Sequence, residues 1–127
     1  MKIAVATDDK KTIRRGHFGE GKFYAIYEIL NGEIFSKELR ENPHVCKGKH
    51  AHGQAIKIIE LLPDCQIYMG RSMGAKSLPQ IAKLSKEPIV TTIENVEEEV
   101  NSYLDSKDEY FKYYNAETGK FCECVER

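Results

Sequence analysis

A histidine on a glycine-rich loop is the first side chain of this sequence with an evident chemical use. His17 stands in the segment RRGHFGEG, where an imidazole can reach a soft or borderline metal through one nitrogen. Arg14, Arg15 and Lys22 are its neighbours in sequence, and their charges can offset the charge of an anionic ligand. The alternative is a surface histidine beside Phe18, with Phe18 anchoring the loop in the core.

A second group of metal-ligating side chains lies in the segment HVCKGKHAHG. His44, Cys46, His50 and His52 bring one thiol and three imidazoles into a short stretch, and these donors suit zinc, copper, nickel or iron. Their spacing matches none of the standard zinc-finger patterns. A solvated loop without metal is therefore the alternative.

The remaining cysteines are weaker candidates. Cys122 and Cys124 form a C-x-C pair that can contact one metal, but the same spacing arises when cysteine alternates along a strand. Cys65 starts an apolar run, so we expect a buried small hydrophobic residue there.

Two further segments have polar groups in suggestive places. The turn GRSMGAKS can present free backbone amides to an anion, with Gly70 and Ser72 as candidate contacts, although it lacks the Walker spacing needed for nucleotide hydrolysis. Asp8 and Asp9 are adjacent in sequence and tend to point apart in an extended segment. A turn or capping role is favoured for them over two-metal binding.

Hydrophobic periodicity predicts the elements that position these groups. Residues 2–7 read as a buried strand, and residues 23–30 and 33–40 as a hairpin around Asn31-Gly32, which suits a type I′ turn. The other predicted elements are a helix over 51–62, a strand over 65–69, a helix from about 77 with Leu84 inward, a strand over 88–92 and a helix over 96–104 capped by Asn95. From residue 105 the pattern breaks, and a terminal hairpin or an ordered arm follows.

This order of elements indicates a mixed α/β fold. Its second half has the βαβ rhythm of parallel strands, and the hairpin adds an antiparallel edge, which gives a five-stranded mixed sheet with three helices. Ligands in open α/β sheets sit beyond the carboxyl ends of strands. Those ends present residues 8–19 and 70–77.

Composition limits the classes of function. The 127 residues suit one domain, and 19 Lys and Arg against 20 Asp and Glu give no field that favours nucleic acid or an anionic membrane. The sequence has no long apolar stretch and no signal-peptide pattern, so we expect a cytoplasmic protein that binds neither nucleic acid nor membrane. Four unevenly placed cysteines are expected to be reduced thiols.

Several segments in the same order resemble the dinitrogenase iron-molybdenum cofactor family, which includes NifX, NafY and the C-terminal domain of many NifB proteins. They are MKIAVATDD, HFG, a hairpin followed by ENP, GRSMGAKSLPQIAKL and TTIENVEEEV. The resemblance covers residues 1–104. Residues 105–127, with the C-x-C pair, are a C-terminal extension outside the shared pattern.

The resemblance implies a ribonuclease H-like three-layer fold without nuclease chemistry. It also implies binding or delivery of iron-molybdenum cofactor, or of its iron–sulfur precursor, in members associated with nitrogen fixation. The histidine of HFG is the proposed cluster ligand in the family and corresponds to His17. The segment 44–52 resembles a His- or Cys-rich loop that many relatives carry after the hairpin.

The leading hypothesis is a carrier of a metal cluster that is not an enzyme and that works with a cofactor-assembly or acceptor protein. His17, with Cys46 and its neighbouring histidines, would hold the cluster. One alternative is a regulatory or interaction protein of the same fold without a cofactor. A less favoured one is a metal-dependent hydrolase or nuclease using Asp8 and Asp9, for which further acidic ligands are missing from the sequence.

Overall fold

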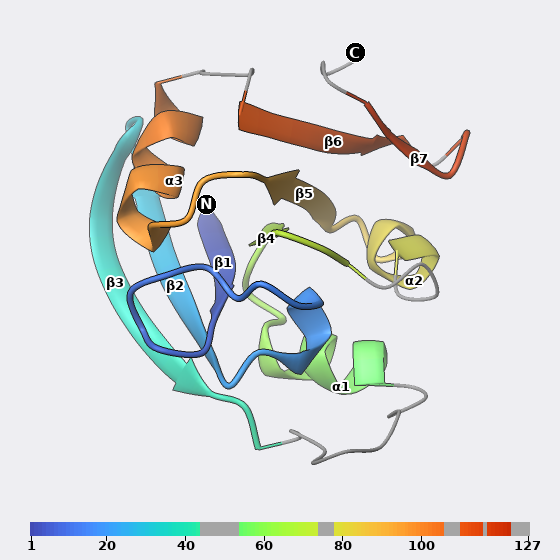
Figure 1. Cartoon of the computed structure of the whole chain (residues 1–127), viewed down its shortest axis with the longest axis horizontal. Coiled ribbons are helices and arrows are strands. Elements are labelled where there is room, and N and C mark those ends of the chain that lie inside the picture. Colours follow the sequence, from blue (N-terminus) through green and yellow to red (C-terminus); the bar gives the residue numbers. More distant parts are fainter. Residues whose placement is uncertain (44–53, 74–77, 106–109, 116, 123–127) are drawn as a thin grey trace.

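One mixed β-sheet organises the chain (Figure 1). The computed structural model describes residues 1–43, 54–73, 78–105, 110–115 and 117–122. The elements in chain order are β1 (Lys2–Thr7), the 3-10 helix η1 (Phe18–Glu20), β2 (Phe23–Leu30), β3 (Glu33–Glu41), α1 (Gln54–Leu61), β4 (Ile67–Gly70), α2 (Leu78–Lys83), β5 (Glu87–Thr91), α3 (Val96–Leu104), β6 (Phe111–Asn115) and β7 (Lys120–Cys122).

The described strands form a seven-stranded sheet in the order β3-β2-β1-β4-β5-β6-β7. Strands β1, β4 and β5 are parallel to one another, whereas β2 and β3 at one end and β6 and β7 at the other pair antiparallel. The mixed α/β fold is therefore confirmed, but the expected count of five strands is wrong. The two additional strands come from the segment after residue 105, which forms a hairpin and pairs with β5.

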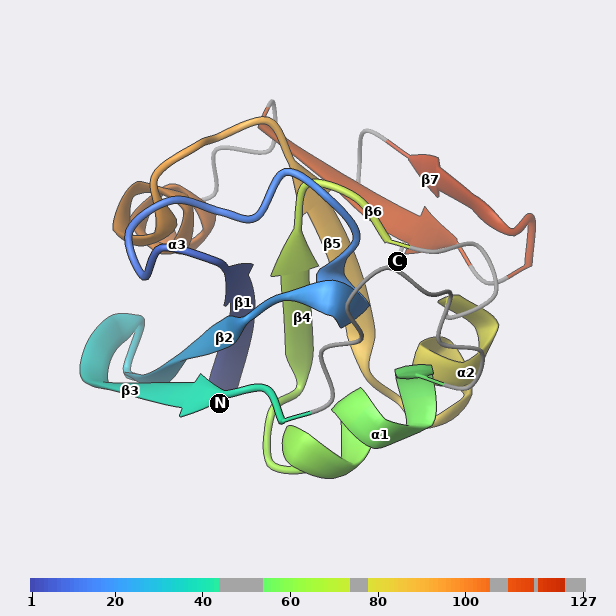
Figure 2. The same cartoon turned by 60° about the horizontal axis from the view of Figure 1, so that its bottom comes forward.

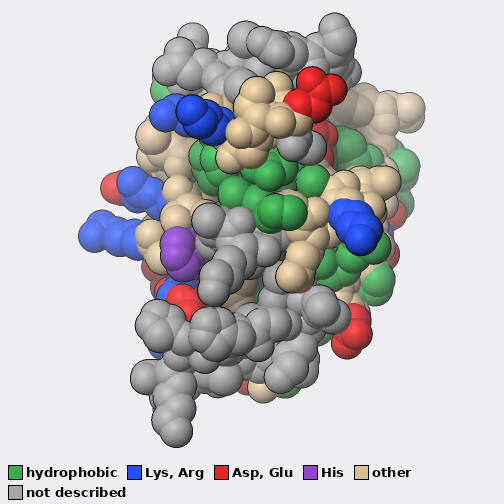
Figure 3. Space-filling view, turned by 90° about the vertical axis from the view of Figure 1, so that its right-hand side faces the viewer, with side chains coloured by type: hydrophobic (Ala, Val, Ile, Leu, Met, Phe, Trp, Pro, Cys, Tyr) green, Lys and Arg blue, Asp and Glu red, His purple; other side chains and the backbone are tan. Residues whose placement is uncertain are grey.

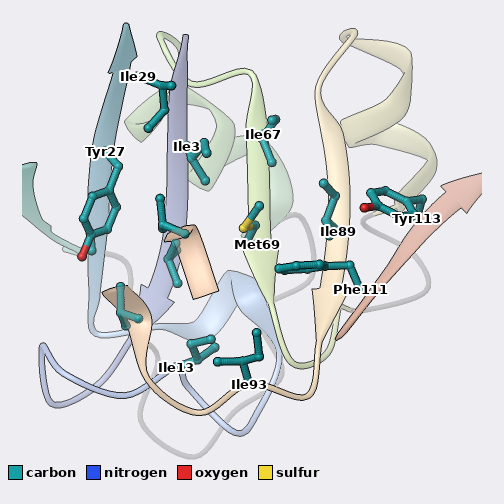
Figure 4. Packing of buried hydrophobic residues seen from close by; sticks show 14 residues of the cluster. Ile3, Ile13, Tyr27, Ile29, Ile67, Met69, Ile89, Ile93, Phe111 and Tyr113 are labelled. Atoms are coloured by element: carbon teal, nitrogen blue, oxygen red, sulfur yellow. The ribbon is translucent and has the colours of Figure 1, made fainter. Parts of the chain in front are cut away.

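Strict alternation along the central strands gives the sheet two buried faces. Ile3 and Val5 of β1 face one core, into which Ile67 and Ile89 also project from the neighbouring strands (Figure 4). Ala4 and Ala6 face the other core. Helix α3 covers the first face, and α1 and α2 cover the second, so the described residues form three layers (Figure 2). Among these residues, no helix is long and apolar enough to cross a membrane.

Local sequence rules explain the hairpin and the second helix. Asn31 and Gly32 have φ values of 54° and 77°, as the expected type I′ turn requires. Helix α2 ends at Lys83, and Ser85 takes a positive φ of 62°. Leu84 is therefore 55% exposed, and the expectation that it faces inward was wrong.

Helix α3 begins at the expected cap and carries a carboxyl group that the sequence does not explain. The Asn95 side chain accepts a hydrogen bond from the Glu98 amide at 2.9 Å. Glu99 is 0% exposed, although its first-turn neighbours lie in solvent. Within the described residues, neither its carboxyl oxygens nor the buried Tyr27 hydroxyl has a hydrogen-bond partner. Burial raises the pKa of Glu99 well above 4.5 and that of Tyr27 to about 12.

Candidate functional site

The loop that follows β1 is folded back by the side chain of Asp9. This carboxylate accepts hydrogen bonds from the amides of Lys11 and Thr12 at 2.9 and 2.7 Å, and from the Thr12 hydroxyl at 2.7 Å. These bonds, with the Thr12 amide as the largest cause, lower the pKa of Asp9. The expected turn role is confirmed for Asp9.

Phe18 fixes the loop to the sheet. Its ring is 2% exposed, and its centroid lies 5.1 Å from that of Tyr24 and 5.2 Å from that of Tyr68. The Tyr24 hydroxyl donates to the Phe18 carbonyl at 2.6 Å, and the Phe18 amide donates to the Ser72 carbonyl at 2.8 Å. The main chain on either side of Phe18 is therefore held at the carboxyl end of β4.

The anchored phenylalanine leaves the preceding side chain at the surface. His17 is exposed, and its Nδ1 lies 2.8 Å from the Ser72 hydroxyl oxygen. Its backbone forms an isolated parallel bridge with Ser72. In the part of the chain that the structure describes, Nε2 has no hydrogen-bond partner. Figure 3 shows a histidine side chain at the surface, on a face that also carries Lys and Arg side chains and an area of hydrophobic ones.

The basic residues expected near His17 differ in their surroundings. The Arg14 guanidinium lies 2.6 Å from an Asp8 carboxylate oxygen and 3.7 Å from one of Glu20, and it donates to the His17 carbonyl at 3.0 Å. Its charge is thus balanced within the loop, and its structural role is to brace the loop around His17. Arg15 and Lys22 are exposed and form no ion pair with other described residues.

The two residues predicted to contact a ligand at the carboxyl end of β4 have different surroundings. Gly70 is buried, and a Cβ placed there would lie 3.4 Å from Cβ of Phe18, so its place is in the packing beneath the loop. Ser72 is half-buried and meets His17. The sequence identified the carboxyl ends of these two strands as a common edge but did not reveal that a hydroxyl on one would meet the imidazole on the other.

The described residues include few of the other predicted sulfur and imidazole ligands. His44, Cys46, His50, His52 and Cys124 fall outside the described residues, and so does the side chain of Cys122. Cys65 is fully buried as expected, and burial raises the pKa of its thiol to about 11, so it is protonated at neutral pH. No group of three or more His, Cys, Asp or Glu side chains within the described segments could hold a metal ion. Those segments therefore contribute His17 as one open ligand.

Comparison with known sequences gives a family match and a relative. A family model described as dinitrogenase iron-molybdenum cofactor matches residues 1–106. The uncharacterized protein MJ0580 of Methanocaldococcus jannaschii is 27% identical over 112 residues, which cover 88% of this chain and 92% of that protein.

Solved structures with little sequence identity share the fold. The crystal structure of PH0822 superposes with a TM-score of 0.70 at 16% identity, covering 84% of this chain and 90% of that one. A Methanocaldococcus jannaschii protein described as a candidate dinitrogenase, MJ0327, gives 0.67 at 15% identity and covers 91% and 95%. A Thermotoga protein described as a candidate NifB protein, TM1290, gives 0.62 at 11% identity and covers 84% and 89%.

Proposed function

We propose, from the premise that this chain belongs to the dinitrogenase iron-molybdenum cofactor family, that it binds a metal–sulfur cluster and carries it without catalysing a reaction. The cargo is iron-molybdenum cofactor or its iron–sulfur precursor. Cofactor-assembly and acceptor proteins would be its partners. The family match confirms the resemblance noted in the sequence, and it covers the hairpin, the His17 loop and all three helices of the described residues.

The exposed imidazole of His17 is the observation that carries this proposal. A carrier must offer a ligand that reaches its cargo yet stays in place, and the loop meets both needs. Phe18 and its backbone bonds fix the main chain, while the ring nitrogen Nε2 has no hydrogen-bond partner in the described segments. Neutral imidazole is a good ligand for iron.

Charge near His17 is also consistent with an anionic cargo. Arg15 and Lys22 are exposed cations on the same loop, and no described carboxylate pairs with them. Arg14, by contrast, pairs with the carboxylates of Asp8 and Glu20 and offsets part of their negative charge. This pairing reduces the repulsion that two free carboxylates would exert on an anion.

His17→Ala is expected to abolish the absorption change that follows anaerobic addition of isolated iron-molybdenum cofactor to the protein. The variant removes the open ligand. Because the His17 side chain is exposed, the free energy of unfolding of the variant should match that of the wild type within about 0.5 kcal/mol. Absorption and electron paramagnetic resonance spectra of the complex provide the measurement.

Lys11→Ala, an exposed change on the same loop, is the matched control and should bind as the wild type does. A second variant with alanine at His44, Cys46, His50 and His52 tests the predicted contribution of that segment. Identical spectra for wild type and His17→Ala would remove His17 from the site and, with it, the basis of the proposal.

A further inference from the structure

We propose that Ser72 is a positioning residue that selects Nε2 of His17 as the atom that binds the cargo. The inference rests on the proposed function, because it assigns a role to Ser72 in the same site. It identifies which ring nitrogen is used and which side chain determines that choice. Ser72 itself does not bind the cluster in this arrangement.

The structure holds the two side chains together from both ends. His17 and Ser72 are 55 residues apart in sequence, yet their backbones form a parallel bridge, and the Phe18 amide donates to the Ser72 carbonyl at 2.8 Å. On the other side of Ser72, Met73 is 8% exposed and packs in the core beneath α1 and α2. Ser72 is thus fixed between two anchors, and its hydroxyl meets Nδ1 at 2.8 Å.

The chemistry of neutral imidazole determines what this contact requires. One ring nitrogen carries the proton and the other carries the lone pair that a metal needs. With Nδ1 in the hydrogen bond, the open position is Nε2, and Nε2 can bind metal only when the proton sits on Nδ1. The Ser72 hydroxyl must then accept a hydrogen bond from Nδ1–H. The opposite arrangement, in which the hydroxyl donates, would leave a proton on Nε2 and block the ligand.

Ser72 is also a neutral acceptor, and this affects how tightly His17 can bind. A carboxylate in that position raises the basicity of a metal-bound imidazole. Two carboxylates of the His17 loop, those of Asp8 and Glu20, pair with Arg14. A hydroxyl partner therefore orients the ring without adding negative charge beside an anionic cargo.

The first test reads the tautomer in the metal-free protein. Nitrogen-15 spectra of the His17 ring, assigned by comparison with His17→Ala, are recorded at an alkaline pH at which the spectra themselves show a neutral ring. The wild type is expected to show the proton on Nδ1. Ser72→Ala should lose this preference, and Ser72→Thr, which keeps the hydroxyl, should retain it. A wild-type ring with its proton on Nε2 would overturn the proposal.

The second test measures affinity for isolated iron-molybdenum cofactor by absorption titration. Ser72→Ala is expected to bind about 10- to 100-fold more weakly than the wild type, the usual effect of losing such a partner. Ser72→Thr should restore binding to within about threefold, and Ser36→Ala, an exposed serine on the distant β3 edge, should have no effect. Wild-type affinity in Ser72→Ala would overturn the role of Ser72.

The two proposals fail in different ways. If His17→Ala binds the cofactor as well as the wild type, the proposed function loses its ligand. If His17→Ala loses binding while Ser72→Ala keeps both the wild-type tautomer and the wild-type affinity, His17 stands as a ligand and only the role of Ser72 is overturned. Loss of both in Ser72→Ala, with recovery in Ser72→Thr, supports the proposal.

Discussion

Phe18→Ala is expected to lower the free energy of unfolding by about 3–5 kcal/mol, the usual cost of removing a buried aromatic ring. The ring is 2% exposed and lies between Tyr24 and Tyr68, so its loss leaves a cavity that the sheet cannot easily close. Urea denaturation followed by circular dichroism measures the change. If the alanine variant does not fold, Phe18→Leu should show a smaller loss in the same direction.

The chain offers a matched control for this experiment. Phe35 is 67% exposed on the outermost strand β3, and Phe35→Ala should change stability by less than about 0.5 kcal/mol. Equal losses for the two variants would contradict the anchoring role of Phe18. The folded Phe18 variant should also bind cofactor more weakly than the wild type, because His17 depends on the same anchor for its position.

Glu99→Gln is expected to remove a pH-dependent destabilisation from the protein. Burial raises the pKa of Glu99 in the folded state, while the unfolded chain titrates near 4.5. As pH rises above 4.5 the unfolded chain releases its proton and the folded protein does not, so folding loses about 1.4 kcal/mol per pH unit until the folded pKa is reached. At pH 7 the Gln variant should therefore be more stable than the wild type.

The test compares the free energy of unfolding of the wild type and of Glu99→Gln across a range of pH. Asp9 and Asp64 have lowered pKa values, and the Arg40 hydrogen bond is the largest cause for Asp64. The stability that these two carboxylates contribute is therefore lost as pH falls, whereas the effect of Glu99 grows as pH rises. Subtracting one curve of unfolding free energy against pH from the other cancels the contributions of Asp9 and Asp64. Glu98→Gln, an exposed change on the same helix, should leave the wild-type pH dependence intact. A parallel pair of curves for wild type and Glu99→Gln would disprove a protonated Glu99.

Features set by local chemistry could be predicted from the sequence. The hairpin depends on two residues of positive φ between alternating strands, and the cap at Asn95 depends on one side chain reaching the amide of Glu98. The parallel strands follow from short apolar runs separated by helical patterns. The burial of Cys65 was predictable because this residue stands at the start of the apolar stretch predicted as a strand over 65–69.

Features that depend on distant pairing could not be predicted in this way. The segment after residue 105 has the alternation of a hairpin, but only its pairing with β5 shows that it extends the sheet. The contact between His17 and Ser72 joins two loops far apart in sequence. Glu99 reads as one of three acidic residues in a helix start, and only the packing of α3 shows that it alone faces the core.

Strand β6 covers the edge of β5. The family match ends at residue 106, yet Phe111 and Tyr113 complete a core that the earlier strands begin. Cut there, the molecule would have β5 as its outermost strand, with the backbone N–H and C=O groups on one side left unpaired. The Thr91 hydroxyl would also lose the Tyr110 carbonyl, to which it donates at 2.7 Å. Without β6, this edge would be a template for pairing with another chain.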